Sequence, residues 1–222
     1  MTTRKTIQPQ DLVCMNEFAS MHHYRVDLAY AQDDNLLFGE RIYREDAKLW
    51  LHVSLAKIVK KSATYCFENH KLRFILYDGL RTTDAQEAMM KTQRALDNPH
   101  WLEKARLLSP PGAGGHPRGM AIDIGLETLD GELIDMGTAF DYLSEDPEKN
   151  PAHRAFPHNQ DVIDNRKILD DSMKQAATSL NMPLLLLPEE WWDFRLPPDI
   201  YEQYEPLSEN DLPAHMRLTI QK

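Results

Sequence analysis

The sequence predicts an α+β protein, because long amphipathic helical patterns occur beside short apolar runs that are typical of buried strands. The helical patterns lie at residues 45–61, 83–96 and 161–180, and the apolar runs at residues 72–77, 120–126 and 183–187. A length of 222 residues without an internal repeat or a low-complexity linker suits one domain. We therefore expect a single domain over 1–222 with irregular ends.

The first predicted helix, at 45–61, has apolar residues at the i, i+4, i+7 and i+8 positions of one helix face, where they can pack in the core. They are Leu51, Leu55, Ile58 and Val59. The pair Lys60-Lys61 suits a helix C-terminus, where positive charge interacts favourably with the helix dipole. We therefore expect the helix to end near this pair.

The central part of the chain alternates predicted strands and helices. The run 72–77 is short and apolar, as expected of a buried strand. Thr83 with Gln86 three residues later forms a capping-box pattern, so a helix is expected to start there and run to about Leu96.

A Pro-Gly-rich loop leads into the strand predicted at 120–126. Asp130-Gly131 is typical of a hairpin turn, with 133–134 as the returning strand. The last predicted helix, at 161–180, has one apolar face, and the run 183–187 is expected to be a buried strand.

Composition excludes several classes of protein. The formal net charge of −10 leaves no excess of Lys and Arg to offset phosphates, so we expect neither a nucleic acid nor an anionic membrane surface as partner. Cys14 and Cys66 form no CxxC pair, so they are expected to be free thiols in a reducing compartment. No signal peptide or 18-residue apolar run is present, which favours the cytoplasm.

The stretch from Gly112 to Leu126 carries a possible metal site. His116 and Asp123 are its only polar groups with obvious metal-ligand chemistry, and both types bind divalent metals, zinc above all. Gly119 would let the backbone turn closely beneath a bound ion without a Cβ in the way. The alternative is a Gly-rich loop with a surface histidine and an aspartate at a strand end.

Two other segments carry similar chemistry. Asp78 and Arg81 lie where a core strand gives way to a helix, a common position for functional groups, although a structural ion pair is the alternative. Glu190 and Asp193 flank two tryptophans, which can equally be plain packing residues. In a regular strand positions i and i+3 point to opposite faces. Glu190 and Asp193 can therefore share a site only in a turn, a bulge or a strand end.

Together these segments supply the parts of a catalytic zinc site. Such a site needs three protein ligands, an open position for water, a base, and a group that stabilises an oxyanion. His116, Asp123 and one carboxylate of the 190–193 segment can bind the metal. The other carboxylate of that segment can be the base, and Arg81 can stabilise the oxyanion.

The chain resembles the D-alanyl-D-alanine dipeptidases of the VanX type, zinc enzymes of the D,D-peptidase/Hedgehog-like fold. The family's Ser-x-His…Gly-x-Ala-x-Asp pattern stands here as Gly114 to Asp123, with the same spacing of seven from His to Asp. Three further family motifs, Glu-Trp-Trp-His, Asp-x-Tyr-Arg and Asp-Met-Gly-Thr-x-Phe-Asp, correspond to 190–193, 78–81 and 135–141. The resemblance extends from about Val26 to Phe194 and implies an α+β fold with a central, mainly antiparallel sheet and flanking helices.

For the metal, the resemblance implies one Zn²⁺ per chain, bound by His116 and Asp123. The third ligand, a histidine in the family, is Asp193 here. Aspartate binds zinc too, but a second carboxylate lowers the positive charge of the site and opens it to manganese or iron. The serine of the family's loop is Gly114, which removes a hydroxyl from the expected substrate pocket.

For catalysis, the resemblance implies that Glu190 is the general base for a metal-activated water and that Arg81 stabilises the tetrahedral intermediate. Asp141 and Asp78 would lie near the substrate, with Asp141 as the partner of its free amino group. A small closed pocket that pairs both termini would explain a dipeptidase rather than a protease of long chains.

The leading hypothesis from the sequence is therefore a cytoplasmic zinc dipeptidase that hydrolyses D-alanyl-D-alanine or a related cell-wall dipeptide. One alternative is a D,D- or L,D-carboxypeptidase that trims peptidoglycan peptides. Another is a non-catalytic binding protein that keeps the fold while Asp193 weakens the metal site.

Overall fold

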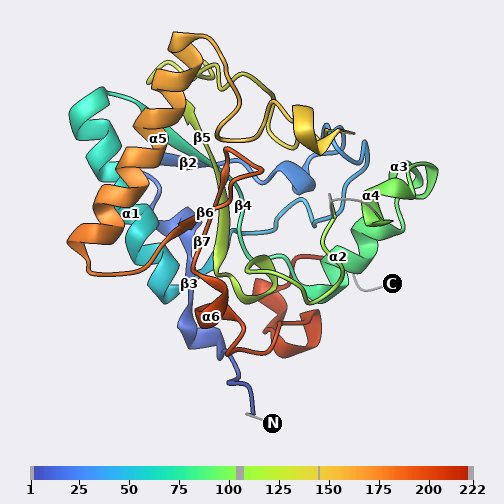
Figure 1. Cartoon of the computed structure of the whole chain (residues 1–222). Helices are drawn as coiled ribbons and strands as arrows, with labels where there is room; N and C mark the ends of the chain where they lie inside the picture. The colour runs from blue at the N-terminus through green and yellow to red at the C-terminus, as the bar shows by residue number, and fades with distance from the viewer. Residues whose placement is uncertain (1–2, 104–107, 145, 220–222) are drawn as a thin grey trace.

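A computed structural model describes residues 3–103, 108–144 and 146–219 and has an α+β fold (Figure 1). Its main sheet has the strand order β2-β4-β5-β7-β6. These strands are β2 (Tyr24–Val26), β4 (Arg73–Asp78), β5 (Ala121–Glu127), β7 (Asp193–Arg195) and β6 (Leu185–Leu186). Strands β2 and β4 run parallel, and the other neighbouring pairs are antiparallel. The expectation of a central, mainly antiparallel sheet is thus confirmed.

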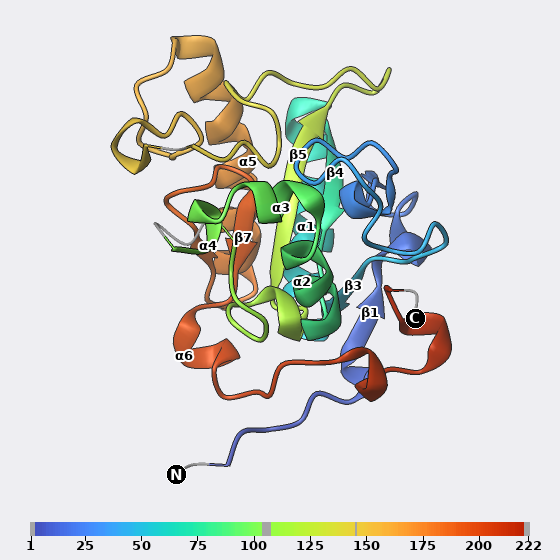
Figure 2. The same cartoon turned by 90° about the vertical axis from the view of Figure 1, so that its right-hand side faces the viewer.

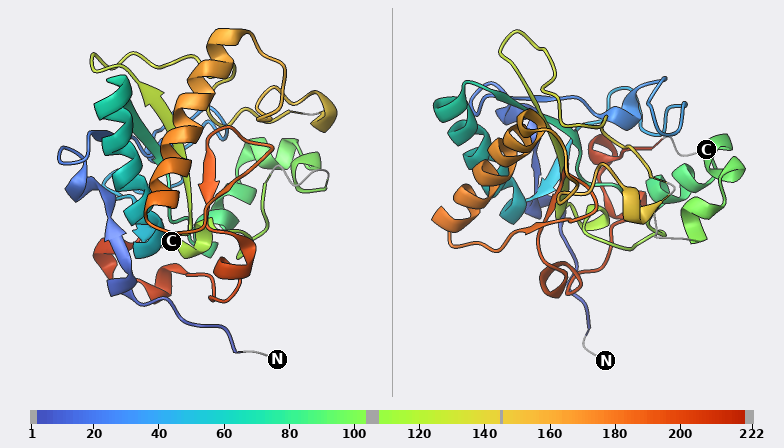
Figure 3. Two further views of the ribbon diagram at one scale, coloured as in Figure 1. Left: turned by 60° about the vertical axis from the view of Figure 1, so that its left-hand side comes forward. Right: turned by 45° about the horizontal axis from the view of Figure 1, so that its top comes forward.

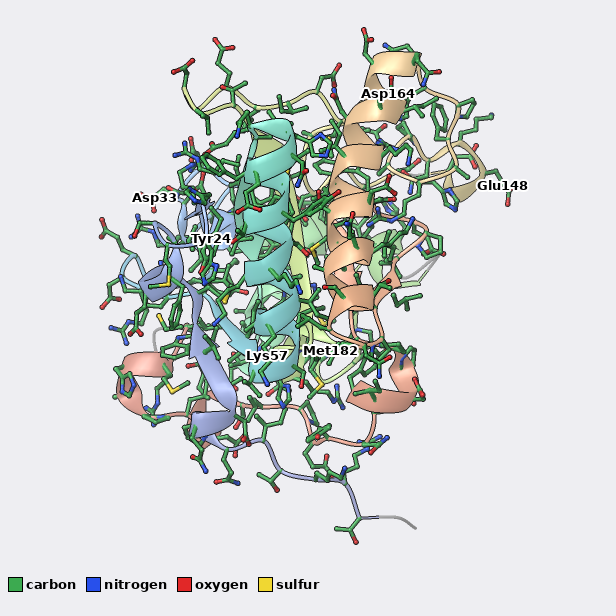
Figure 4. The ribbon with its side chains drawn as sticks, turned by 90° about the vertical axis from the view of Figure 1, so that its left-hand side faces the viewer. Tyr24, Asp33, Lys57, Glu148, Asp164 and Met182 are labelled. Carbon is green, nitrogen blue, oxygen red and sulfur yellow. The ribbon has the colours of Figure 1, made fainter. Side chains whose placement is uncertain are left out.

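Helices α1 (Val53–His70) and α5 (Gln160–Ser179) lie side by side on one face of this sheet (Figures 3 and 4). Their inward faces are apolar and buried, which explains why the helices pack there. The buried apolar residues are Leu55, Ala56, Ile58, Val59, Ala63 and Cys66 of α1 and Val162, Leu169, Met173, Ala176 and Ala177 of α5.

Short helices lie on the opposite side of the sheet (Figure 2). They are α2 (Thr83–Met90), α3 (Gln93–Asp97) and α4 (His100–Glu103), while α6 (Pro198–Tyr201) follows β7. A separate antiparallel pair, β1 (Leu12–Cys14) and β3 (Trp50–His52), leads directly into α1. The face of the sheet away from α1 and α5 is therefore framed by short elements and loops.

The helix predicted at 45–61 was placed too early. Residues 50–52 form β3, and α1 starts at Val53 because His52 caps it, accepting a hydrogen bond from the Ser54 amide at 3.3 Å. The helix also continues beyond the lysine pair to His70, where Lys71 adopts a left-handed conformation with φ +57°. Leu51 is buried, but in the strand rather than on the helix.

The helix predicted at 83–96 is two helices. Thr82, not Thr83, caps α2, and its hydroxyl accepts from the Ala85 amide. Thr92 then interrupts the helix by capping α3 in the same way, with the Ala95 amide as donor. Elsewhere the positions of β4, β5, β6 and α5 confirm the predictions to within about two residues, a normal error for element ends. The expectation that β6 is buried is wrong, because its residues are half-buried at the edge of the sheet.

The predicted hairpin at Asp130-Gly131 is present as a turn. Gly131 has φ +90°, and beyond it Leu133 forms an isolated antiparallel bridge with Glu127 at the end of β5. Cys14 and Cys66 are both buried free thiols, as expected. Within the described ranges, the helices lack the combination of length and apolar character that a membrane-spanning segment requires.

The C-terminal segment 196–219 wraps beneath the loop that precedes β5. The amide of Leu207 donates to the carbonyl of Pro117 at 2.8 Å, and its own carbonyl accepts from the Thr83 amide at 2.9 Å. Farther on, the buried Glu209 carboxylate accepts a hydrogen bond from the Thr82 hydroxyl at 2.7 Å. The segment thus joins the loop before β5 to the start of α2.

Candidate metal centre and active site

Three neighbouring strands bring three aspartates into one row. Asp78 at the end of β4 pairs with Asp123 of β5 beside a register shift, and Asp123 is directly opposite Asp193 at the start of β7. Directly paired residues on adjacent antiparallel strands have Cβ atoms about 5 Å apart. All three carboxylates are buried. The sheet therefore unites the acids at 78, 123 and 193, which lie far apart in the sequence.

His116 reaches the same place from the short 3-10 helix His116–Arg118, directly before β5. Its ring is oriented by a hydrogen bond between Nδ1 and the carbonyl of Gly79 at 2.8 Å, in which Nδ1–H donates. That bond leaves Nε2 facing Asp123 Oδ1 at 3.5 Å and Asp193 Oδ2 at 3.3 Å. A backbone carbonyl that fixes one ring nitrogen and frees the other is common behind metal-binding histidines.

The loop before His116 is held by Arg118. Its Nη1 donates to the carbonyls of Gly112 and Gly114 at 2.9 and 2.8 Å. Gly119 has φ +59°, and a Cβ there would lie 2.9 Å from the backbone nitrogen of His52. The close approach of β3 therefore requires the glycine, and its expected role beneath a bound ion stays a prediction.

The residues at this point fit a divalent metal. Asp123 Oδ1 is buried and has no hydrogen-bond partner among the described residues, which is costly unless a ligand or ion completes it. Two ligand atoms at about 2.0–2.2 Å from one tetrahedral ion lie roughly 3.3–3.6 Å apart, the separation found between His116 Nε2 and both facing carboxylates. Ligand atoms of Asp78, His116 and Asp123 also lie within 4.8 Å of one another.

Asp78, however, is already bonded to protein groups. Its Oδ1 accepts from the Tyr43 hydroxyl at 2.7 Å, and its Oδ2 accepts from Nε of Arg81 at 2.8 Å. Nη2 of Arg81 forms an ion pair with the same Oδ2 at 2.7 Å. Its Oδ2 lies 3.5 Å from Nδ1 of His116, on the side of the ring opposite Nε2. Among the described residues, Asp78 is not part of the cavity lining, so the structure connects it with Arg81 rather than with open space.

Arg81 lies between Asp78 and the cavity. Its Nη2 is 3.5 Å from Asp123 Oδ2 and 3.4 Å from the Tyr30 hydroxyl, and its guanidinium lies 5.1 Å from the centre of the Tyr30 ring. The side chain is 13% exposed and lines the cavity. A fixed positive charge thus borders the possible metal site.

Asp193 is held by Arg195, a residue that the sequence analysis missed. Nε of Arg195 donates to Asp193 Oδ1 at 2.7 Å, and Nη2 donates to Oδ2. The two residues are i and i+2 in β7 and therefore share a face of the strand, a spacing that could have revealed the pair. Burial opposes ionisation of Asp193, but Arg195 and His116 hold its pKa below the usual range.

Glu190 lies in the turn before β7, so the expected conflict between positions 190 and 193 does not arise. Both residues line the same cavity. Burial, followed by the charges of Asp193 and Asp123, raises the pKa of Glu190 to about 8. A carboxyl group that titrates near neutrality can exchange protons with a reacting group.

Asp141 also lines the cavity and has a strained backbone, with φ +60°. Its Oδ1 accepts from the Tyr30 hydroxyl at 3.1 Å, and burial together with Asp123 raises its pKa to about 7. Left-handed conformations of non-glycine residues are often found at functional sites. Tyr30 had no local sequence signal, because its role depends on contacts with distant segments.

These groups surround one cavity of about 270 Å³. Its walls include the apolar side chains of Leu37, Leu108, Leu143, Leu187 and Trp192. This volume lies just below the roughly 300–1,000 Å³ of pockets for drug-sized ligands, so a small ligand is expected. The cavity therefore combines a candidate metal site, two carboxyl groups of raised pKa and two guanidinium groups.

Comparisons with known proteins gave consistent results. The profile of the Peptidase M15 family, described as D-ala-D-ala dipeptidase, matches residues 10–209. The D-alanyl-D-alanine dipeptidase of Escherichia coli (strain K12) is 26% identical over 172 residues, 78% of each chain. The enzyme of the same name from Enterococcus faecium is 28% identical over 200 residues, 82% of this chain and 90% of that one.

Among solved structures, the crystal structure of the Serratia marcescens L-Ala D-Glu endopeptidase ChiX aligns with 68% of this chain and 84% of its own. The sequence identity is 14% and the TM-score 0.39, a likeness too slight to define the fold.

Proposed function

Because the chain belongs to the D-ala-D-ala dipeptidase family, Peptidase M15, and is therefore a metallopeptidase, we propose that it hydrolyses D-alanyl-D-alanine or a related cell-wall dipeptide with one zinc ion. One observation carries the proposal. His116 Nε2 faces two carboxylates at ligand-to-ligand distances, inside a small cavity that also holds a carboxyl group of raised pKa.

We assign the metal to His116, Asp123 and Asp193. Asp193 is favoured over Asp78 as the third ligand because the Nε2 atom of His116 faces Asp193. Asp78 lies beside Nδ1, on the other side of the ring, and its two oxygens already bond to Tyr43 and Arg81. A divalent metal held there would polarise the scissile carbonyl and lower the pKa of the attacking water. The Arg195 guanidinium supplies positive charge next to a ligand that is an aspartate where the family has histidine.

Glu190 acts as the general base in this proposal. It accepts a proton from the attacking water and returns it to the amino group that leaves. Its pKa of about 8 makes the carboxyl group basic enough to take the proton and acidic enough to return it near neutral pH. Its position in a turn gives the side chain access to the cavity.

Arg81 stabilises the negative charge that develops on the carbonyl oxygen. Preorganised donors are effective in such a role because they need no reorientation during the reaction. Asp78 and Tyr30 hold the guanidinium in place, and Tyr43 in turn holds Asp78. In this proposal Asp78 positions Arg81 and does not contact the substrate itself.

Asp141 binds the free amino group of the dipeptide. Its carboxylate lines the cavity and accepts a hydrogen bond from the Tyr30 hydroxyl, which also contacts Arg81. An ammonium group at that position would lower the pKa of Asp141 from its raised value and form a charge-assisted hydrogen bond. A peptide with a blocked amino group would lose this contact.

The test is hydrolysis of D-alanyl-D-alanine by the zinc-loaded protein, measured as released D-alanine. The variants His116→Ala and Glu190→Ala should lose turnover, and His116→Ala should also bind less zinc. A zinc-loaded protein that cleaves no dipeptide would contradict the proposal. Cleavage of a cell-wall pentapeptide but not of the dipeptide would favour the carboxypeptidase, and failure to bind zinc would favour a binding protein.

A further inference from the structure

The Nη1 donors of Arg195 are not used by any described residue. Its Nε and Nη2 are both bonded to Asp193, and no partner of Nη1 is found in the described part of the chain. The side chain is 14% exposed and lines the cavity. A guanidinium group has five donors in a fixed plane, so the pairing with Asp193 leaves the Nη1 donors directed elsewhere.

Gly114 leaves room beside the Nη1 donors. A Cβ built on Gly114 would have Arg195 Nη1 as its nearest neighbour, at 3.8 Å. The glycine has φ +82°, and its carbonyl is held by Arg118 at 2.8 Å, so the backbone beside Nη1 is fixed and carries no side chain. No side chain at position 114 therefore fills the space next to Nη1.

The charge of the cavity restricts where a ligand carboxylate can bind. The lining includes the acids Asp123, Asp141, Glu189, Glu190 and Asp193, which repel an anion. Apart from a bound metal ion, the groups that best stabilise a carboxylate entering this cavity are guanidinium groups, with which it can form charge-assisted hydrogen bonds. Among the residues that the structure describes, the two guanidinium groups that line the cavity belong to Arg81 and Arg195.

The position of Asp141 distinguishes these two candidates. Asp141 contacts Tyr30, which contacts Arg81 three residues beyond the end of β4, whereas Arg195 ends β7. Strand β5 separates β4 from β7, so the two sides of the cavity lie about 10 Å apart. An extended dipeptide spans about 7 Å, and a hydrogen bond of about 3 Å at each end extends its reach to roughly 13 Å, enough to cover that separation. A dipeptide whose ammonium group meets Asp141 thus directs its carboxylate away from Arg81.

We propose that Arg195 determines specificity by binding the C-terminal carboxylate of the substrate through Nη1, in the space beside Gly114. This inference rests on the proposed dipeptidase function and adds to it the residue that binds the substrate's carboxylate. The site therefore accepts dipeptides with a free carboxylate and discriminates against those with a neutral C-terminal amide.

The test compares D-alanyl-D-alanine with D-alanyl-D-alaninamide. Binding of both is measured by calorimetry to zinc-loaded Glu190→Gln protein, in which hydrolysis is suppressed. The charged dipeptide should bind roughly 10- to 100-fold more tightly, as expected for a charge-assisted pair. Introducing Arg195→Lys should reduce this ratio about tenfold or more, because lysine can still pair with Asp193 but has no second nitrogen to offer.

Arg73→Lys is the control for Arg195→Lys, and Gly114→Asn is the control for Gly114→Asp. Arg73→Lys changes an arginine that pairs with Glu127 at the opposite end of β4, and the ratio should remain as in the parent. Gly114→Asp places a carboxylate beside Nη1 and should abolish the preference while Arg195 still holds Asp193. Gly114→Asn, with a neutral side chain of the same shape and equal tolerance for positive φ, should keep the preference. Zinc content is measured for every variant.

The inference would be overturned if the affinity ratio of dipeptide to amide stayed unchanged in both Arg195→Lys and Gly114→Asp. It would also be overturned if the parent protein bound D-alanyl-D-alanine and its amide equally. If Arg81→Lys, but not Arg195→Lys, removed the preference for the charged dipeptide, Arg81 would be the residue that binds the carboxylate. Hydrolysis by the unmodified enzyme is read separately. A protein that binds the charged dipeptide through Arg195 but never cleaves it would refute the peptidase proposal and leave this one standing.

Discussion

Zinc binding to the metal-free protein should release about one proton per ion at pH 7. Burial opposes protonation of the His116 imidazole, but the Asp123 carboxylate prevails and raises the pKa of His116 to about 10. A histidine must be neutral to bind a metal, so the Nε2 proton has to leave. The gap of roughly three pH units to neutrality costs about 4 kcal/mol, or a thousandfold in affinity. The observed zinc dissociation constant should therefore fall about tenfold for each pH unit gained between pH 6 and 8.

Calorimetric zinc titrations in buffers of different ionisation enthalpy count the released protons directly. The same titrations at pH 6, 7 and 8, against a competing chelator, give the slope of affinity with pH. Arg73→Lys serves as a control because Arg73 pairs with Glu127 far from the metal site. A zinc affinity that does not change with pH, together with a proton count near zero, would refute the assignment of His116 as a ligand that is protonated in the metal-free protein.

Three further variants test the supports of the site. Arg81→Lys should lower kcat by about 10²–10³-fold with little change in KM, because the fixed donors to the oxyanion are lost, and steady-state kinetics with an unchanged kcat would contradict this. Tyr43→Phe should lower the free energy of unfolding by about 1–3 kcal/mol in urea denaturation, because it leaves an oxygen of the buried Asp78 unpaired. Gly125→Ala places a Cβ 2.7 Å from the Tyr77 ring and should destabilise the protein by about 1–3 kcal/mol, an effect that Tyr77→Leu should partly relieve if the clash is the cause.

Local patterns predicted most of the regular elements, and they failed where the pattern was ambiguous. Leu51 is buried both in the predicted helix and in the observed strand, so hydrophobic spacing did not separate the two. The residue that starts α1 is His52, which is not among the common N-caps, so the start was not recognised. Thr92 is a common cap, but the apolar pattern running through it concealed the break between α2 and α3.

The candidate site was predictable where its residues lie close together in the sequence or belong to a spaced motif, as His116 and Asp123 do. Asp193 was identified through the motif at 190–193, and the sheet register now places it opposite Asp123. The roles of Tyr30 and of the Arg195 guanidinium group were not predicted. Their importance depends on long-range packing against Asp141 and Gly114, for which no local spacing provides a signal.

The C-terminal segment wraps beneath the loop that carries His116, which has a consequence for local unfolding. The Leu207 amide and carbonyl join this segment to Pro117 and Thr83, and Arg118 reaches the carbonyl of Tyr204 at 2.8 Å. Amide hydrogens in the two regions should therefore exchange with solvent as one cooperative unit. Conditions that detach the tail would release the histidine turn in the same opening event, before the helices behind the sheet begin to exchange.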